Sequence, residues 1–159
     1  MIDFNNLSER AVQAEKHFKD GYNCAQSVVL AFSDLMDIDQ ETLLRMASPF
    51  GGGMGRMREV CGTVSGMNLV LGYLEGYSLP GSHPEKTAVY KKVRDLAGEL
   101  SEINGSFICR ELLAGVPHTD GGVPEQRTEG YYKRRPCGKL VACAAMILEN
   151  HLREEGFEV

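Results

Sequence analysis

The sequence lacks three features that would point to particular classes of protein. Its 17 lysine and arginine residues are outnumbered by 22 aspartate and glutamate residues, which gives a formal net charge of −5. Dedicated nucleic-acid-binding proteins are normally basic, so nucleic acid is not an expected partner. The longest apolar run, Leu140 to Leu148, is far shorter than the roughly 20 residues of a spanning helix. Residues 1–9 lack the basic and apolar regions of a secretory signal, so we expect a cytoplasmic protein.

The composition is that of an ordinary globular domain with an unusual number of cysteines. Of the 159 residues, 43% are hydrophobic and 25% are charged, and five are cysteines. A chain of this length can bury a sizeable core without disulfide bonds. In a reducing compartment, cysteines are more often catalytic, metal-binding or redox-active than structurally bridged. The cysteines are therefore the strongest functional signal in the sequence.

The hydrophobic pattern predicts an all-α fold. Apolar residues recur at steps of three and four along most of the chain, and no segment shows sustained strand alternation. We expect a compact single-domain bundle of about five to six helices. These helices are expected over residues 7–18, 23–35, 39–47, 60–75, 83–103 and 136–154, with a further short helix over 109–114.

Two segments between the expected helices are unusual. Gly51 to Gly55 is not a phosphate-binding loop, because no Gly-Lys-Ser/Thr follows, and Arg56 stands where a dinucleotide fingerprint needs its third glycine. We expect this segment to turn the chain sharply and to bring backbone N–H groups near Cys61. Residues 115–135 are polar, turn-rich and too long for an ordinary connection, which is typical of a lid or a mobile loop. The expected organisation is a single helical domain over 1–159 with a mobile loop at 115–135.

Four of the five cysteines are expected at the start of a helix. Cys24 follows the N-cap residue Asn23, and Cys61 follows the glycine-rich turn. Cys109 opens the short helix and Cys137 lies in the first turn of the last one. Unpaired N–H groups and the positive end of the helix dipole favour a thiolate at such positions. We therefore predict one shared thiolate site built from these four cysteines.

The surroundings of the cysteines sharpen this prediction. Cys143 lies six residues after Cys137, about 240° around the helix, among alanines, and is expected to fill the core. Arginines stand close in sequence to three of the four site cysteines, at positions 56, 58, 110, 134 and 135. The candidates for contacts to a cofactor are Gly51, Gly52, Gly53, Gly62 and Arg56. We expect Cys61 or Cys24 to be the most reactive thiol.

Several short motifs, in order, are similar to those of a known family. The motifs are Gly21-Tyr22-Asn23-Cys24-Ala25-Gln26-Ser27-Val28, Phe50-Gly51-Gly52-Gly53, Cys61-Gly62-Thr63-Val64-Ser65-Gly66, Cys109-Arg110-Glu111-Leu112, and Cys137 with Val141 and Ala144-Ala145. Together they resemble the C_GCAxxG_C_C family of redox-active proteins, small helical proteins of bacteria and archaea, over residues 21–148. The resemblance implies that Cys24, Cys61, Cys109 and Cys137 are the four family cysteines. Thr63 departs from the family pattern, which has alanine there.

Three functions remain open from the sequence. The first is an oxidoreductase role by thiol–disulfide chemistry among the four cysteines, with a redox protein or a small thiol as partner. The second is electron transfer through an iron–sulfur cluster held by the four thiolates, with zinc as a weaker form because its ligands usually come in close-spaced pairs. The third is a non-redox binding module built on Met54, Met57, Met67 and the long loop. Family genes often lie near transporter genes, which implies a membrane transporter as a partner. The sequence leaves the oligomeric state open.

Overall fold

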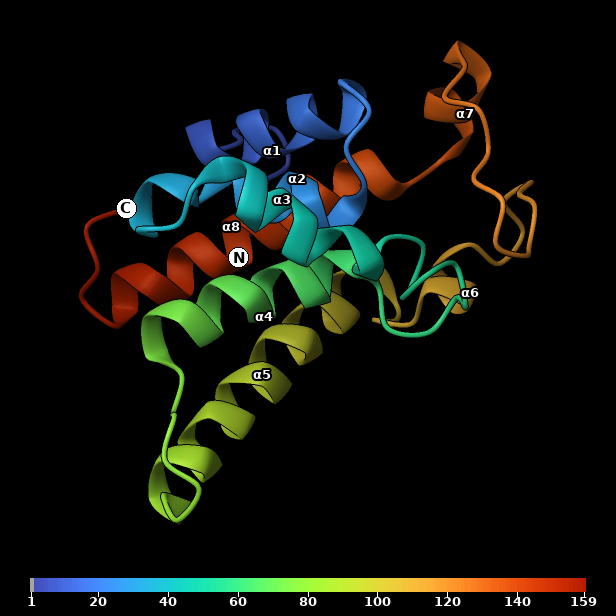
Figure 1. Ribbon diagram of the computed structural model, residues 1–159. Helices are drawn as coiled ribbons and strands as arrows, with labels where there is room; N and C mark the ends of the chain where they lie inside the picture. Colours follow the sequence, from blue (N-terminus) through green and yellow to red (C-terminus); the bar gives the residue numbers. More distant parts are fainter. Residues whose placement is uncertain (1) are drawn as a thin grey trace.

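The helix α8 forms the centre of the structure. The computed structural model describes residues 2–159, and within them α8 contacts α1, α2, α4 and α5. Figure 1 shows α8 lying between α1 and α4. Most of its side chains from Leu140 to Leu148 are buried, because a helix with neighbours on several sides must be apolar around most of its circumference.

The described residues form eight α-helices and two short 3-10 helices, and they contain no strand. The all-α prediction is therefore confirmed, and the count exceeds five to six because short helices are included. The α-helices are α1 Glu9–Lys19, α2 Cys24–Ala31, α3 Gln40–Ala47, α4 Gly62–Glu75, α5 His83–Asn104, α6 Cys109–Leu112, α7 Glu129–Arg134 and α8 Cys137–Glu154, and the 3-10 helices are Ser33–Leu35 and Ser48–Phe50.

Two details differ from the sequence prediction. The helix expected over 23–35 ends at Ala31 and gives way to a 3-10 turn, which lets Asp34 accept two hydrogen bonds from Arg10 of α1 at 2.6 and 2.8 Å. The segment expected as a loop over 115–135 contains α7, whose first turn is capped by the Thr128 hydroxyl. The end of α2 thus coincides with a contact to α1, whereas α7 begins at a local cap.

Glycines bring α4 close to α2. A Cβ added to Gly66 would lie 2.8 Å from the Val28 Cβ and 2.9 Å from the Ala25 carbonyl oxygen. A Cβ on Gly62 would lie 3.2 Å from the Cys24 Cβ. Ordinary side chains would force these helices apart, so the glycines set the distance between the first residues of the two helices.

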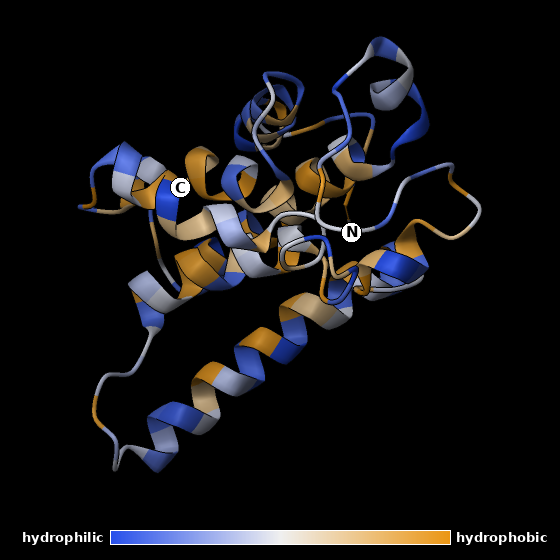
Figure 2. Cartoon of the chain, turned by 45° about the vertical axis from the view of Figure 1, so that its right-hand side comes forward, coloured by the Kyte–Doolittle hydropathy of each residue, from blue (hydrophilic) through white to orange (hydrophobic). Residues whose placement is uncertain are grey.

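The helix α5 is less buried than the others. Figure 2 shows hydrophilic residues along much of its length, and its buried residues, Leu96, Ala97 and Leu100, all lie in its second half. The apolar spacing of Val89, Val93, Leu96, Leu100 and Ile103 predicts one buried stripe on this helix, but Ile103 is 38% exposed. Across residues 2–159, no helix combines the length and the apolar character that crossing a membrane requires.

Candidate functional site

Four of the five cysteines line one cavity of about 60 Å³ at the N-terminal end of α8. Cys24, Cys109 and Cys137 are the first residues of α2, α6 and α8, and Cys61 immediately precedes α4. Cys24 and Cys137 are partly exposed, whereas Cys61 and Cys109 are buried. The structure therefore brings together all four cysteines that the sequence placed at helix starts.

A short antiparallel pairing joins the segments that carry Cys61 and Cys109. Val60 forms a bridge with Ile108. The Cys61 N–H donates to the Phe107 carbonyl at 2.9 Å, and the Cys109 N–H donates to the Glu59 carbonyl at 2.6 Å. These bonds hold the two buried cysteines on neighbouring backbones at the same side of the cavity.

The glycine-rich turn has an unusual backbone conformation and lies very close to the paired segments that carry Cys61 and Cys109. Five consecutive residues, Gly52 to Arg56, have positive φ angles between 56° and 69°, so the chain makes a left-handed turn there. Such a conformation costs about 1–2 kcal/mol for a residue with a side chain, which explains why three of the five are glycine. A Cβ on Gly53 would lie 2.6 Å from the Cys109 Cβ and 2.8 Å from the Glu59 nitrogen. Only glycine lets the turn lie this close to the cavity wall.

Three arginines line the cavity. Arg58 is buried, and its Nη1 lies 3.9 Å from the Cys109 sulfur. Arg127 stacks on the rings of Phe18 and Tyr131 at 4.4 and 4.9 Å. Arg135 is buried against the Tyr131 ring, also at 4.9 Å. The cysteines thus lie in a positively charged pocket, although the protein as a whole is acidic. The positive charge of the pocket favours the binding of anions and the thiolate form of the cysteines.

The arginines act most strongly on Cys137. A hydrogen bond from the Cys24 thiol, together with the charges of Arg135 and Arg127, lowers the pKa of Cys137 to about 7, although burial opposes the change. The same hydrogen bond and burial raise the pKa of Cys24 well above its ordinary value. The two sulfurs therefore form a pair in which Cys24 keeps its proton and Cys137 loses it near neutral pH.

The two buried cysteines are protonated thiols at neutral pH. Burial raises the pKa of Cys61 to about 11, partly offset by the Thr63 hydroxyl at 3.1 Å from its sulfur. Burial also raises the pKa of Cys109, and Arg58 opposes this. The sequence argument chose Cys61 or Cys24 as the most reactive thiol, whereas these pKa shifts favour Cys137. The reason is that helix position alone ignores the desolvation that dominates at Cys61.

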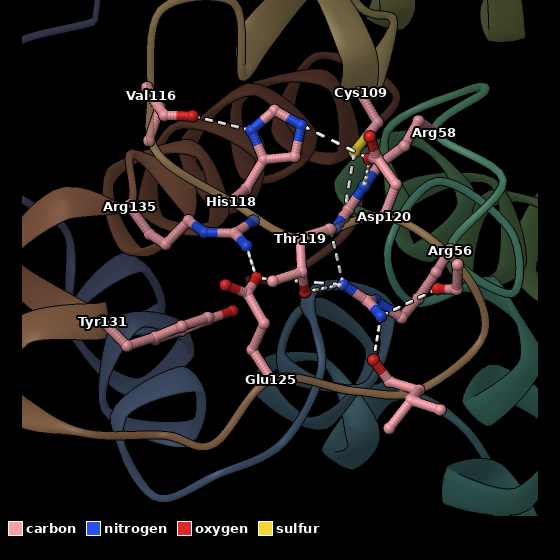
Figure 3. A network of polar contacts seen from close by, with 12 residues as sticks. Arg56, Arg58, Cys109, Val116, His118, Thr119, Asp120, Glu125, Tyr131 and Arg135 are labelled. Carbon is pink, nitrogen blue, oxygen red and sulfur yellow. Dashed lines mark hydrogen bonds and ion pairs between the residues drawn. The ribbon is translucent and has the colours of Figure 1, made fainter.

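The predicted cofactor contacts divide between two adjoining spaces. Gly52, Gly53 and Gly62 line the cysteine cavity, whereas Gly51 and Arg56 line a neighbouring pocket of about 270 Å³. Figure 3 shows the Arg56 guanidinium directed at the 115–128 loop, where it donates to the carbonyls of Thr119, Gly121 and Val123. Arg56 thus holds the loop rather than the cysteines.

Sequence reasoning missed Arg127 and Tyr131, which lie in the segment expected as a mobile loop. Both line the cysteine cavity, and Arg127 also donates to the Phe18 and Tyr22 carbonyls at 3.2 and 3.3 Å. Their separation in sequence from Cys24 and Cys61 left no local signal. Arg134 is exposed and does not line the cavity.

Cys143 lies outside the cavity, as expected. It is fully buried and accepts a hydrogen bond from the Asn104 side chain at 3.5 Å. Burial raises the pKa of this thiol. Cys143 is therefore a core residue.

A zinc site requires its ligand atoms to lie close together, so the distances between candidate ligand atoms test whether the cysteines could form one. Zinc–sulfur bonds of about 2.3 Å place tetrahedral thiolates within about 4.6 Å of one another. Among residues 2–159, the group of three ligand atoms within 4.8 Å of one another is Glu75, His151 and Glu155, and it includes no cysteine. That group is occupied by ion pairs, since Lys92 Nζ contacts Glu155 at 2.9 Å and also contacts Glu75. The cysteines as placed do not form a zinc-sized set.

Comparison with known proteins gives one match. A family model described as "Putative redox-active protein (C_GCAxxG_C_C)" matches residues 22–151, which is most of the chain and includes all four cavity cysteines. Neither a curated protein nor a solved structure matches the chain.

Proposed function

The chain belongs to the C_GCAxxG_C_C family, and from that premise we propose that it carries out thiol–disulfide exchange, with Cys137 as the attacking thiolate and Cys24 as the resolving thiol. The observation that carries the proposal is that Cys24 and Cys137 line one cavity together with Arg127 and Arg135, and that the pKa of Cys137 is lowered there to about 7. Cys24 and Cys137 are partly exposed, whereas Cys61 and Cys109 are buried, so a partner disulfide would meet the first two before the others. A low-pKa, accessible thiol beside a second thiol is the usual arrangement of a reactive dithiol.

The reaction is a two-electron exchange with a disulfide. The Cys137 thiolate attacks one sulfur of the partner disulfide, a mixed disulfide forms, and the other partner sulfur leaves as a thiolate. Cys24 then loses its proton and attacks the Cys137 sulfur, which closes the Cys24–Cys137 disulfide and releases the second partner thiolate. The protein dithiol is oxidised, the partner disulfide is reduced to two thiols, and the reverse sequence regenerates the dithiol.

The chain's other residues have supporting roles in this scheme. Arg135 and Arg127 stabilise the thiolate before attack, and Cys24, which lines the same cavity, supplies the thiol of the resolving step. Cys61 and Cys109 line the same cavity as buried thiols.

An iron–sulfur cluster is the second candidate. The observation that favours it is that four thiols from four separate helix starts line one cavity with three arginines. The positive surroundings would suit an anionic cluster, and cysteine thiolates are the usual ligands of such clusters. Cys24, Cys61, Cys109 and Cys137 would then all serve as ligands, and the cluster would supply one-electron transfer.

One experiment separates these candidates. The protein is purified without oxygen, its iron content is measured, and it is then equilibrated with glutathione buffers of graded potential, with free thiols counted and disulfides mapped by mass spectrometry. We expect iron-free protein that loses two thiols together and forms the Cys24–Cys137 disulfide. Stoichiometric iron that is lost in Cys61→Ser would contradict the exchange mechanism and favour the cluster. Iron-free protein that keeps all five thiols would favour a non-redox binding module, such as one that contacts a transporter.

A further inference from the structure

A second pocket opens beside the cysteine cavity. It has a volume of about 270 Å³ and shares with the cavity the residues Asn23, Gly52, Arg58, Arg127, Tyr131 and Arg135. The 115–128 loop forms its far wall through Gly122, Pro124 and Glu125. A molecule in this pocket would therefore lie next to the thiols.

The pocket is strongly positive. Its lining includes four arginines, Arg56, Arg58, Arg127 and Arg135, against one carboxylate, in a protein whose formal net charge is −5. Guanidinium groups bind carboxylates and other oxyanions through paired hydrogen bonds. The pocket therefore has the donor chemistry of an anion site.

The one carboxylate in the lining, that of Glu125, already lies between two of these arginines. Glu125 forms an ion pair with Arg135, and its Oε2 lies 3.8 Å from Arg56 (Figure 3). This carboxylate is supplied by the loop, and the loop carbonyls of Thr119, Gly121 and Val123 and the Thr119 hydroxyl accept the hydrogen bonds of Arg56. The side chain of Glu125 is only 16% exposed, so it is held within the pocket.

A further guanidinium nitrogen in the same pocket has no hydrogen-bond acceptor. Arg58 is buried, and its Nε lacks a hydrogen-bond partner among the described residues, with the Asp120 carboxylate at 3.6 Å. A buried charged donor without an acceptor is costly, so Arg58 contributes positive charge beside the pocket that the chain's own acceptors only partly satisfy.

We infer that this pocket binds the carboxylate of a small anionic substrate that reacts at Cys137, and that the substrate carboxylate takes the position of Glu125. The inference rests on the proposed function, because it assigns the substrate class of the same thiol site. Small anionic disulfides would be preferred over neutral or cationic ones. The Glu125 carboxylate closes the pocket in the absence of substrate and competes with it.

Two alkylating reagents test this inference without a known substrate. Iodoacetate carries a carboxylate and iodoacetamide is its neutral counterpart. Both react with the thiolate, so the ratio of their rate constants at Cys137 is independent of the thiolate fraction. We expect Arg56→Gln to lower the iodoacetate-to-iodoacetamide ratio about threefold, the effect of one unit charge at about 6 Å in bulk water. Glu125→Gln should raise the ratio by a similar factor.

Matched variants separate a local effect from the overall charge. Arg134→Gln removes the same charge from an exposed position outside the pocket and should leave the ratio unchanged. Arg56→Lys keeps the charge and should restore most of the wild-type ratio. Equal ratios in wild type, Arg56→Gln and Glu125→Gln would overturn the inference. If these variants do not fold, inorganic phosphate added to wild type at constant ionic strength should slow iodoacetate more than iodoacetamide, and equal slowing would overturn it.

The outcome is separable from that of the redox experiment. A dithiol that forms the Cys24–Cys137 disulfide but shows no pocket-dependent ratio would retain the proposed function and lose the anion site. A pocket-dependent ratio in a protein that forms no disulfide would retain the anion site and lose the exchange reaction.

Discussion

Cys137 and Cys143 belong to the same helix, and they have opposite environments. Cys143 is fully buried in the middle of α8, and burial raises its pKa. Cys137 is at the first residue of α8, where the Cys24 hydrogen bond and two arginines lower its pKa despite burial. The comparison teaches that desolvation alone keeps a cysteine inert, and that a thiolate requires partners brought from other segments.

The largest expected contrast is in oxidation. Cys137→Ser removes the attacking thiolate, so we expect complete loss of the intramolecular disulfide in a glutathione buffer that fully oxidises wild type. Cys143→Ser should still form it, because Cys143 lies outside the cavity. Thiol counting after alkylation measures both. If a folded Cys143→Ser protein failed to form the disulfide, the claim that Cys143 takes no part in the reaction would be wrong.

The free energy of unfolding tests whether the middle of α8, where Cys143 lies, is the packing centre of the protein. Leu148→Ala removes a fully buried side chain of α8 and should lower the free energy of unfolding by about 2–5 kcal/mol. Leu79→Ala makes the same substitution at a residue that is 67% exposed and should change it by less than about 0.5 kcal/mol. Urea denaturation followed by circular dichroism measures both. Similar losses from the two variants would show that the middle of α8 is not the packing centre.

The left-handed turn offers a matched pair of glycines at the cavity end. Gly53→Ala and Gly55→Ala both place a Cβ at positive φ, which costs about 1–2 kcal/mol. The added Cβ has nothing within 4 Å at Gly55, whereas at Gly53 it meets the Cys109 Cβ at 2.6 Å. We therefore expect Gly53→Ala to lose about 1–3 kcal/mol more than Gly55→Ala in denaturant unfolding. Equal losses would mean that the turn does not lie tightly against Cys109.

The smallest expected effect concerns the charge beside the thiolate. Arg135→Gln removes a positive charge and a hydrogen bond from Cys137, so the pKa of this thiol should rise from about 7 by roughly half a unit to one unit. Arg134→Gln, at the exposed neighbouring position, should leave that pKa unchanged. The pH dependence of iodoacetamide labelling measures both variants. If the labelling of Cys137 had the same pH midpoint in Arg135→Gln and Arg134→Gln, Arg135 would not be a residue that stabilises the thiolate.

The sequence predicted the features that local patterns determine. Helix periodicity and the cap residue Asn23 predicted the all-α fold and most helix starts, and the cysteines were correctly expected at those starts. The position of Cys143 in the core followed from its angle on α8 relative to Cys137.

The features that depend on contacts between distant segments were missed. The end of α2 coincides with the contact between Asp34 and Arg10 of α1, whereas α7 begins at a local cap, Thr128. Arg127 reaches the cavity only because the loop folds back over α1 and stacks on Phe18. The prediction of Cys61 or Cys24 as the reactive thiol takes no account of the burial that raises the pKa of Cys61, or of the Cys137 hydrogen bond and the burial that raise the pKa of Cys24. Periodicity carries no information about desolvation or about which guanidinium lies beside which sulfur.

Labelling of the native protein with limiting iodoacetamide across pH, with each cysteine quantified by mass spectrometry, shows whether Cys137 is the reactive thiolate. The account predicts that Cys137 is labelled first, with a rate that is half-maximal near pH 7 and falls about tenfold per pH unit well below it, because only the thiolate reacts. Preferential labelling of Cys24, Cys61 or Cys143, or a midpoint for Cys137 near the ordinary thiol value of about 8.5, would contradict it.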